Sequence, residues 1–203
     1  MAPRGYTLRR RAETSAATRD RIIDAAAALY RERGVTATTI QAVAERADVA
    51  RGTVANHFGS ADGLLEAVLD RAAEEVEYPV PSQLDGIVAL EDRIRAFVDI
   101  TIRFFDRGTD WWQVFYGDIE HPAIKARERV YWETFATFYG AAFGELAADR
   151  LVGAAVRAFV DYGPVHALQA AGLSLDETIE VVAVALVSVT RERIAAQGEE
   201  RSK

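Results

Sequence analysis

Apolar residues recur every three or four positions along most of the chain, and no stretch shows the apolar–polar alternation of a half-buried strand. The spacing therefore predicts an all-α fold of about nine helices. Gly34, Gly108 and Gly172 each follow an apolar period and predict helix ends, because glycine readily takes the left-handed conformation that closes a helix. The expected helices span residues 18–33, 40–47, 50–58, 60–77, 87–106, 111–116, 122–143, 149–171 and 175–196.

Local signals refine several of these boundaries. Thr38 offers a hydroxyl that could cap the helix at 40–47. Pro122 suits the first turn of the helix that it opens, whereas Pro164 falls inside 149–171 and predicts a kink there. Ser174 to Glu177 forms a capping box, which opens the last helix.

Residues 38–58 contain two short apolar patterns that meet at a tight turn. The pattern breaks at Asp48-Val49, and Ala44 is small where two helices crossing at about 90–120° must approach closely. This layout is that of a helix-turn-helix, whose second helix enters the DNA major groove. The inward positions are Ile40, Val43, Ala44 and Ala47 on the first helix, and Val54 and Phe58 on the second.

The block at 18–70 resembles the TetR family of one-component transcription regulators. The resemblance covers about a quarter of the chain and is carried by two motifs. The first is an arginine, an isoleucine, two alanines and an aromatic residue before a glycine, and the second leads into a histidine-phenylalanine pair. They appear here as Arg21-Ile22, Ala25-Ala26, Tyr30 and Gly34, and as Ala50-Arg51-Gly52-Thr53-Val54-Ala55 followed by His57-Phe58.

Four positions depart from the family pattern. Ala50 stands where the family usually has a capping serine, so the second helix lacks a hydroxyl that is usually worth ~0.5–2 kcal/mol. Asp48 replaces the common turn glycine, and aspartate tolerates a left-handed backbone. Ala55 and Ala61 replace a tyrosine and a lysine that often contact DNA, which predicts a weaker grip on phosphates.

The resemblance implies a set of DNA-binding residues on these two helices. Asn56 could pair with adenine, and Arg51 could contact guanine or phosphate. Because no nucleophile lies near His57, a phosphate or base-edge contact is the preferred interpretation of that residue. The predicted DNA-binding residues are Thr38, Thr39, Arg51, Thr53, Asn56 and His57.

Charge is divided unevenly along the chain, whose net charge is −7. Residues 1–64 hold ten arginines against seven acids, whereas residues 65–203 hold fourteen basic residues against twenty-four acids. The basic excess thus coincides with the helix-turn-helix, where counterion release favours DNA. Residues 1–17, with Arg9 to Arg11, are expected to be a flexible basic arm, which is either simply disordered or reaches DNA.

The prolines in residues 78–86 mark a connection between the helix-turn-helix segment and the remainder of the chain. We therefore expect a DNA-binding domain at 18–64, with its motif at about 40–59. An effector-binding and dimerisation domain is expected at 65–203.

Thirteen of the nineteen aromatic residues lie between Phe97 and Phe143. Spacing alone fits either a large aromatic core or a ligand pocket, since pockets are mostly apolar with a few polar groups. The family resemblance favours a pocket for a small hydrophobic or aromatic effector. The side chains predicted to line it are Phe104, Trp111, Phe115, Tyr131, Trp132, Phe135, Tyr139, Tyr162 and His166.

The segments at 149–171 and 175–196 are rich in alanine and valine. Residues 181–187 leave no polar face over two turns, and a helix that is apolar all round must be covered on every side. The resemblance implies that a second copy supplies this cover, giving a homodimer through a four-helix bundle.

Other chemistries find little support. The chain has no cysteine, and no phosphate loop or nucleophile motif appears. Asp118, Glu120 and His121 could suggest a metal site but lack one-face helical spacing, so capping or solvation is preferred. His166, one turn after Tyr162, suggests a buried, hydrogen-bonded histidine or a ligand contact. No enzyme activity, cofactor or metal is predicted.

The longest apolar run is far shorter than the ~20 residues that span a bilayer, and the N-terminus lacks an apolar signal segment. A cytoplasmic protein that does not enter the membrane is therefore expected.

These observations together predict a ligand-responsive transcription regulator, in the first instance a repressor released from operator DNA by its effector. The helix at 60–77 would act as the pivot. The alternative is a helical small-molecule-binding protein or enzyme with a vestigial DNA-binding domain. Ala50, Ala55 and Ala61 keep this interpretation open, because they replace residues that cap the second helix or often contact DNA in the family.

Overall fold

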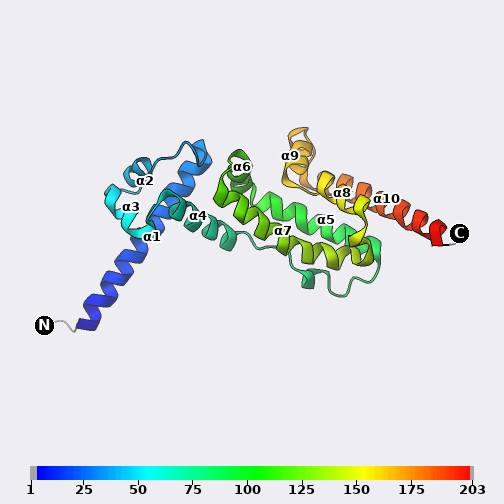
Figure 1. Ribbon diagram of the computed structural model, residues 1–203, viewed down its shortest axis with the longest axis horizontal. Helices are drawn as coiled ribbons and strands as arrows, with labels where there is room; N and C mark the ends of the chain where they lie inside the picture. Colours follow the sequence, from blue (N-terminus) through cyan, green and yellow to red (C-terminus); the bar gives the residue numbers. More distant parts are fainter. Residues whose placement is uncertain (1–3, 202–203) are drawn as a thin grey trace. The chain divides into compact units, whose positions relative to one another are not determined.

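The computed structural model describes the backbone of residues 4–201 and the side chains of residues 12–199. Within this range the chain is all-α, as predicted, with ten α-helices, two short 3-10 helices and no strand (Figure 1). The α-helices are α1 (Arg4–Arg33), α2 (Ile40–Arg46), α3 (Arg51–Phe58), α4 (Ala61–Glu75), α5 (Leu90–Arg107), α6 (Thr109–Gly117), α7 (Pro122–Phe143), α8 (Arg150–Phe159), α9 (Tyr162–Ala170) and α10 (Leu175–Arg201); the 3-10 helices are η1 (Pro81–Leu84) and η2 (Gly144–Ala148).

The helices form two compact units. The first consists of Met1–Glu75 and Asp110–Glu128, and the second of Val76–Thr109 and Arg129–Lys203. In space, therefore, α4, α6 and the first turns of α7 belong with the N-terminal helices. The functional boundaries at 17/18 and 64/65 remain predictions.

Helix α1 begins at Arg4 instead of residue 18, so the part of the expected arm that is described is helical. The segment is rich in alanine and arginine, both good helix formers, but it buries no residue from 12 to 21. Apolar periodicity therefore could not reveal it. The side chains of Arg9 to Arg11 lie outside the described residues. Gly34 ends the helix with φ +83°, as predicted.

The first unit is built on the buried face of α1, which packs against α2 and α4. Tyr30 is almost fully enclosed, and its burial, together with the charge of Asp62, raises its pKa to about 12. The core of this unit contains Ile22, Ile23, Ala26, Leu29, Val43, Val54, Leu64, Leu65 and Val68, all nearly inaccessible to water.

The expected single helix at 149–171 is two helices, so the predicted kink at Pro164 was wrong. The break falls at Val160 and Asp161, and Asp161 caps α9 by accepting a hydrogen bond from the Tyr162 amide. Pro164 then lies in the first turn of α9, where a missing N–H costs no helical hydrogen bond.

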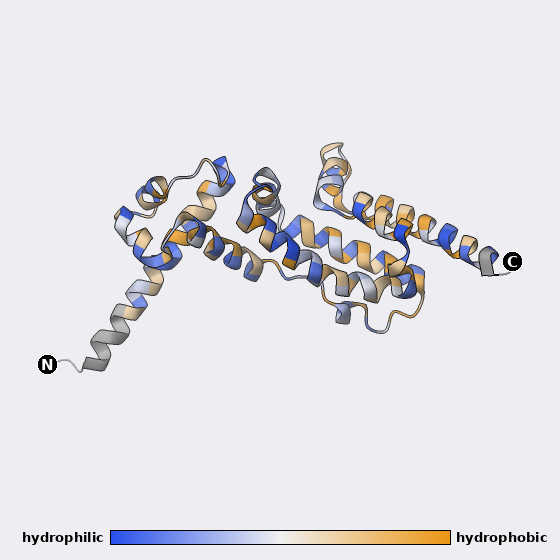
Figure 2. Cartoon of the chain, viewed as in Figure 1, coloured by the Kyte–Doolittle hydropathy of each residue, from blue (hydrophilic) through white to orange (hydrophobic). Residues whose placement is uncertain are grey.

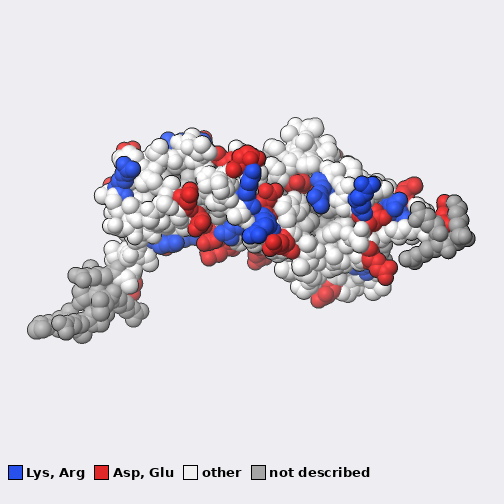
Figure 3. Space-filling view, viewed as in Figure 1, with Lys and Arg blue, Asp and Glu red and all other residues white. Residues whose placement is uncertain are grey.

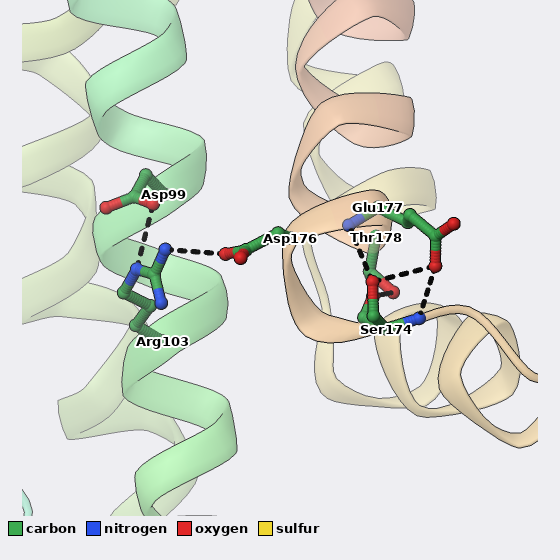
Figure 4. A network of polar contacts seen from close by, with 6 residues as sticks. All are labelled: Asp99, Arg103, Ser174, Asp176, Glu177 and Thr178. Atoms are coloured by element: carbon green, nitrogen blue, oxygen red, sulfur yellow. Dashed lines mark hydrogen bonds and ion pairs between the residues drawn. The ribbon is translucent and has the colours of Figure 1, made fainter.

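In the second unit α5 packs against α10, and α10 also packs against α8 and α9. The capping box that opens α10 is confirmed: Ser174 and Glu177 exchange backbone-to-side-chain hydrogen bonds (Figure 4). In the same first turn of α10, Asp176 pairs with Arg103 of α5, which also pairs with Asp99, at 2.9 Å to each (Figure 4). These contacts set the start of α10 against α5.

Candidate nucleic-acid interface and aromatic cluster

Helices α2 and α3 meet as the sequence predicts. Val43, Ala44 and Val54 are each 1% exposed and form the seam between the two helices. Asp48 adopts φ +51° at the turn, and the amide of Val49 donates to the carbonyl of Ala44 at 3.0 Å. The left-handed aspartate therefore performs the geometric task that a turn glycine would perform.

The opposite face of α3 carries polar side chains toward solvent. Arg51 and Asn56 are exposed, whereas Thr53 and His57 are half-buried, and the His57 ring lies 6.0 Å from that of Phe58. Within the described part of the chain, neither Arg51 nor Asn56 makes a side-chain hydrogen bond or ion pair. Both side chains are therefore available to an external partner.

The two threonines before α2 differ in what they can offer. Thr39, not Thr38, caps the helix by accepting a hydrogen bond from the Ala42 amide at 3.2 Å, so the prediction that Thr38 caps this helix was wrong. Thr38 instead donates its hydroxyl to the carbonyl of Gly34 at 2.7 Å. A phosphate requires a donor, and only the Thr39 hydroxyl keeps its proton uncommitted.

The three alanines that depart from the family pattern lie where the sequence predicts missing contacts. Ala50 is the N-cap of α3 and provides no side-chain hydrogen bond, as expected. Ala55 and Ala61 are both exposed, so their small side chains leave open surface where longer ones would project.

Gly63 holds α3 in place, a role that the sequence analysis missed. A Cβ at this position would lie 2.2 Å from the carbonyl oxygen of Phe58, so only glycine lets α4 approach the end of α3 so closely. Ser60 caps the same turn by accepting from the Gly63 amide, and Arg19 of α1 lies 5.1 Å above the Phe58 ring. The serine and glycine spacing was visible in the sequence, but the close approach was not.

Basic and acidic side chains are interspersed on the face drawn in Figure 3. Arg46 pairs with Glu32 at 2.5 Å, and Arg71 with Asp20 at 2.8 Å. These two arginines are therefore partly neutralised, whereas Arg51, like Arg21 and Arg33, has no such partner in the described residues.

An aromatic cluster fills the second unit between α5 and α7. The Phe97 ring lies 5.4, 5.2 and 5.3 Å from the rings of Phe135, Phe138 and Phe143. Phe104 stacks on Tyr131 at 6.0 Å, with the two rings nearly parallel. Trp132 packs edge-on against Tyr131 and Phe135, at 5.1 and 5.6 Å.

Not all the predicted effector residues join this cluster. Trp111 and Phe115 belong to the first unit, where Trp111 donates to Glu75 at 3.2 Å and lies 4.8 Å beneath the guanidinium of Arg31. Tyr162 is buried beside Phe105 in the second unit. His166 stacks on Tyr162 but is exposed, so the expectation of a buried histidine was wrong.

Tyr139 combines burial with an unused polar group. Its hydroxyl oxygen is inaccessible to water and has no hydrogen-bond partner in the described chain. The ring packs on Phe143 at 4.8 Å, and the hydroxyl faces Gly153 of α8. Burial, reinforced by the charge of Asp149, raises the pKa of Tyr139, so the phenol stays a neutral donor.

Helices α8 and α10 leave large apolar side chains open to solvent. Val181 and Val184 of α10 are 48% and 46% exposed, while Val182, Ala183, Leu186 and Val187 are buried within the unit. Orange, hydrophobic residues recur along α10 in Figure 2. We call the exposed set the apolar face; it consists of Leu151, Phe159, Val181, Val184 and Ile194.

The residues considered for a metal have other partners. His121 accepts a hydrogen bond from the Ala123 amide in the first turn of α7, Glu120 pairs with Lys125, and Asp118 binds the loop before α2. None of the helices in the described range has both the length and the apolar character that crossing a bilayer requires.

Comparison with known proteins identifies the N-terminal unit. Residues 22–68 match the family described as "Bacterial regulatory proteins, tetR family". The transcriptional regulator HbdR of Aromatoleum sp. (strain CIB) is 33% identical over 76 residues, which are 37% of this chain and 33% of that protein. The chain spans about a third to just over half the length of the first curated relatives it matches.

Solved structures extend the likeness to the whole fold. A TetR family transcriptional regulator from Pseudomonas syringae pv. tomato is 28% identical, with a TM-score of 0.55 over 84% of this chain and 94% of that one. NalD, a secondary repressor of a multidrug efflux pump in Pseudomonas aeruginosa, is 19% identical, with a TM-score of 0.63 over 87% and 97% of the two chains.

Proposed function

Because the chain belongs to the TetR family of bacterial regulatory proteins, we propose that it is a homodimeric, ligand-responsive transcription regulator that binds operator DNA through α3. A small effector would change its operator affinity, most simply by releasing it as a repressor.

The exposed face of α3 carries this proposal. Arg51 and Asn56 project from a helix whose other side is fixed by a buried seam, so the backbone places both residues on the outward face before any DNA arrives. Side chains on this face suit hydrogen bonding to base edges, with Asn56 on adenine and Arg51 on guanine. Thr53, His57 and the hydroxyl of Thr39 would add contacts to the backbone or to bases.

A second copy of the chain is the proposed cover for the apolar face. Valines that are almost half exposed in the N-terminal half of a long helix leave apolar surface that water solvates poorly. Packing α8 and α10 against their symmetry mates would bury this surface and place two α3 helices for successive major grooves, about 34–36 Å apart.

The aromatic cluster is the proposed effector site in the second unit. Among the described residues, the buried polar or charged ones apart from tyrosine and tryptophan are Thr101, Thr178 and Thr190, all in the second unit, and each donates its hydroxyl to a carbonyl four residues earlier. The buried interior of this unit therefore contains no ionic group within the described residues. A neutral, largely apolar effector with a hydrogen-bond acceptor for Tyr139 fits this interior, with Phe104, Tyr131, Trp132, Phe135 and Tyr162 as the candidate lining and His166 as a further candidate, whereas Trp111 and Phe115 belong to the first unit and are left out of this proposal.

A mobility-shift titration tests the central claim. The labelled probe is the DNA upstream of the protein's own reading frame, titrated at 50 and 200 mM salt against a scrambled duplex of equal length. A regulator binds the native duplex preferentially and loses affinity steeply with salt. Equal, weak binding to both duplexes would favour the alternative of a ligand-binding helical protein with a vestigial head.

A further inference from the structure

Asp118 fastens the segment after α6 to the loop that precedes α2. Its carboxylate accepts hydrogen bonds from the Val35 amide at 2.7 Å, the Thr36 amide at 3.4 Å and the Thr36 hydroxyl at 2.5 Å. Both partners belong to the first unit, although 83 residues separate Asp118 from Val35. The loop it grips leads directly to Thr39 and the start of α2.

Gly34 makes this approach possible. A Cβ at Gly34 would lie 2.9 Å from the Oδ2 atom of Asp118, and the residue holds φ +83°. The glycine therefore serves two purposes, since it ends α1 and leaves room for the carboxylate. The contact between Asp118 and the loop therefore depends on a glycine at position 34.

Other contacts bind the same segment, residues 110–128, to the N-terminal helices. Trp111 is held between Arg31 of α1 and Glu75 of α4, and Arg127 pairs with Asp70 of α4. Asp118 differs from these anchors because it reaches the loop and not a helix flank. It therefore helps to hold the loop that leads into α2.

The chain runs into this segment from α5 and leaves it through α7, the two helices that supply the aromatic cluster. α7 is one continuous helix, so Arg127 and the cluster residue Tyr131 lie one turn apart on it. The segment and the aromatic cluster are therefore joined by an unbroken stretch of helix.

We propose that Asp118 is a positioning residue for DNA binding and the link through which the aromatic cluster and α2–α3 influence each other. This inference rests on the proposed function. Because Asp118 bonds the loop that leads into α2, we expect DNA bound at α3 to slow opening of the segment that carries Asp118. The link can thus be tested with DNA alone, before any effector is known.

Hydrogen–deuterium exchange on the full chain provides the test. Peptides covering α6 are followed with and without a saturating amount of the native upstream duplex, in the unaltered protein and in Asp118→Asn. The asparagine presents an NH₂ group where a second acceptor oxygen stood, so it cannot serve all three donors. Asp110→Asn, an exposed residue of α6, is the matched control.

We expect DNA to slow exchange in α6 by about fivefold or more in the unaltered protein and in the Asp110→Asn control, in line with typical coupling factors. In Asp118→Asn the DNA-dependent slowing disappears, although mobility shift still detects binding. Thr36→Val removes the hydroxyl donor from the other side of the contact and should reduce the slowing in the same way. This variant also serves if Asp118→Asn folds poorly.

Three results would overturn the link. If DNA binds and α6 does not respond in the unaltered protein, the inference fails while the proposed function stands. If Asp118→Asn and Thr36→Val respond like the unaltered protein, coupling runs through another contact. If no preferential DNA binding occurs at all, the proposed function fails and the link fails with it.

Discussion

Helices α3 and α10 each bury one side within the chain, but they present opposite kinds of surface to solvent. α3 exposes Arg51 and Asn56, whose hydrogen-bonding groups are already solvated and wait for a polar partner. α10 exposes Val181 and Val184, which gain only from being removed from water. The first surface suits reversible reading of a polar groove, and the second suits lasting association with another apolar surface.

The largest expected effect comes from charging the apolar face. Replacing Val181 and Val184 with glutamate would place uncompensated carboxylates in the proposed dimer interface, at a cost of ~3–5 kcal/mol each. The dimer dissociation constant should rise at least about 100-fold, as measured by sedimentation equilibrium. Val88→Glu is the control, because Val88 is 87% exposed and lies outside this face. A dimer unaffected by the double substitution would show that α10 faces water.

Truncating the polar surface of α3 should have the next largest effect. Asn56→Ala is expected to cost ~1–3 kcal/mol of operator affinity, which is about 5- to 150-fold, with no change in thermal stability. Gln169→Ala, which removes an amide from α9 in the second unit, should leave the mobility shift unchanged. Equal affinities for the two variants would mean that α3 does not read bases.

The packing of α4 against α3 can be tested independently of any ligand. Gly63→Ala should destabilise the protein by ~1–3 kcal/mol in urea unfolding, because the new methyl group collides with the Phe58 carbonyl. Gly140→Ala meets no atom within 4 Å and should stabilise the protein by ~0.5–1 kcal/mol. Similar effects of the two changes would argue against the close approach at Gly63.

Acid titration should reveal the Asp118 contact. Partial burial by itself raises the pKa of this carboxyl, but the hydrogen bonds from Thr36 and Val35, with the charge of His121, lower it below its ordinary value overall. Its contribution to stability is therefore complete above the ordinary pKa of an aspartate and is lost as pH falls through the lowered folded-state value. The stability gap between the protein and Asp118→Asn should be present above about pH 5 and shrink below about pH 4. A gap independent of pH would show that the carboxylate charge is irrelevant.

The smallest effect is expected inside the aromatic cluster. Tyr139→Phe removes a buried hydroxyl that has no partner in the described chain, so stability should be unchanged or rise by up to ~1 kcal/mol. Calorimetry of the two proteins without ligand measures this directly. A marked loss of stability would show that the hydroxyl serves the fold and not an effector.

Local signals predicted much of this fold. The turn at Asp48, the stop at Gly34 and the capping box at Ser174 all depend on residues within a few positions of one another, so the sequence carries their full cause. The prediction failed where a local signal competed with another. Thr39 displaced Thr38 as the cap, and Asp161 moved the break that Pro164 seemed to require.

The candidate sites also include residues that local sequence could identify and residues that it could not. Arg51 and Asn56 could be named from their motif because an α-helix with one buried seam determines which residues face outward. The effector residues were named from aromatic abundance and the family resemblance, and neither can say which rings share a unit. Trp111 and Phe115 accordingly belong with the N-terminal helices, and His166 points to solvent.

By itself, the sequence determined the helical class, the two-helix reading unit and the side of α3 that faces outward, because each follows from periodicity and short-range capping. Only the tertiary structure decided that Asp118 grips the loop before α2, that Gly63 must lack a side chain, and that Tyr139 holds an unused hydroxyl. These features join residues far apart in the chain, or depend on how closely two helices approach each other. The packing of the whole chain creates them, and no local pattern encodes it.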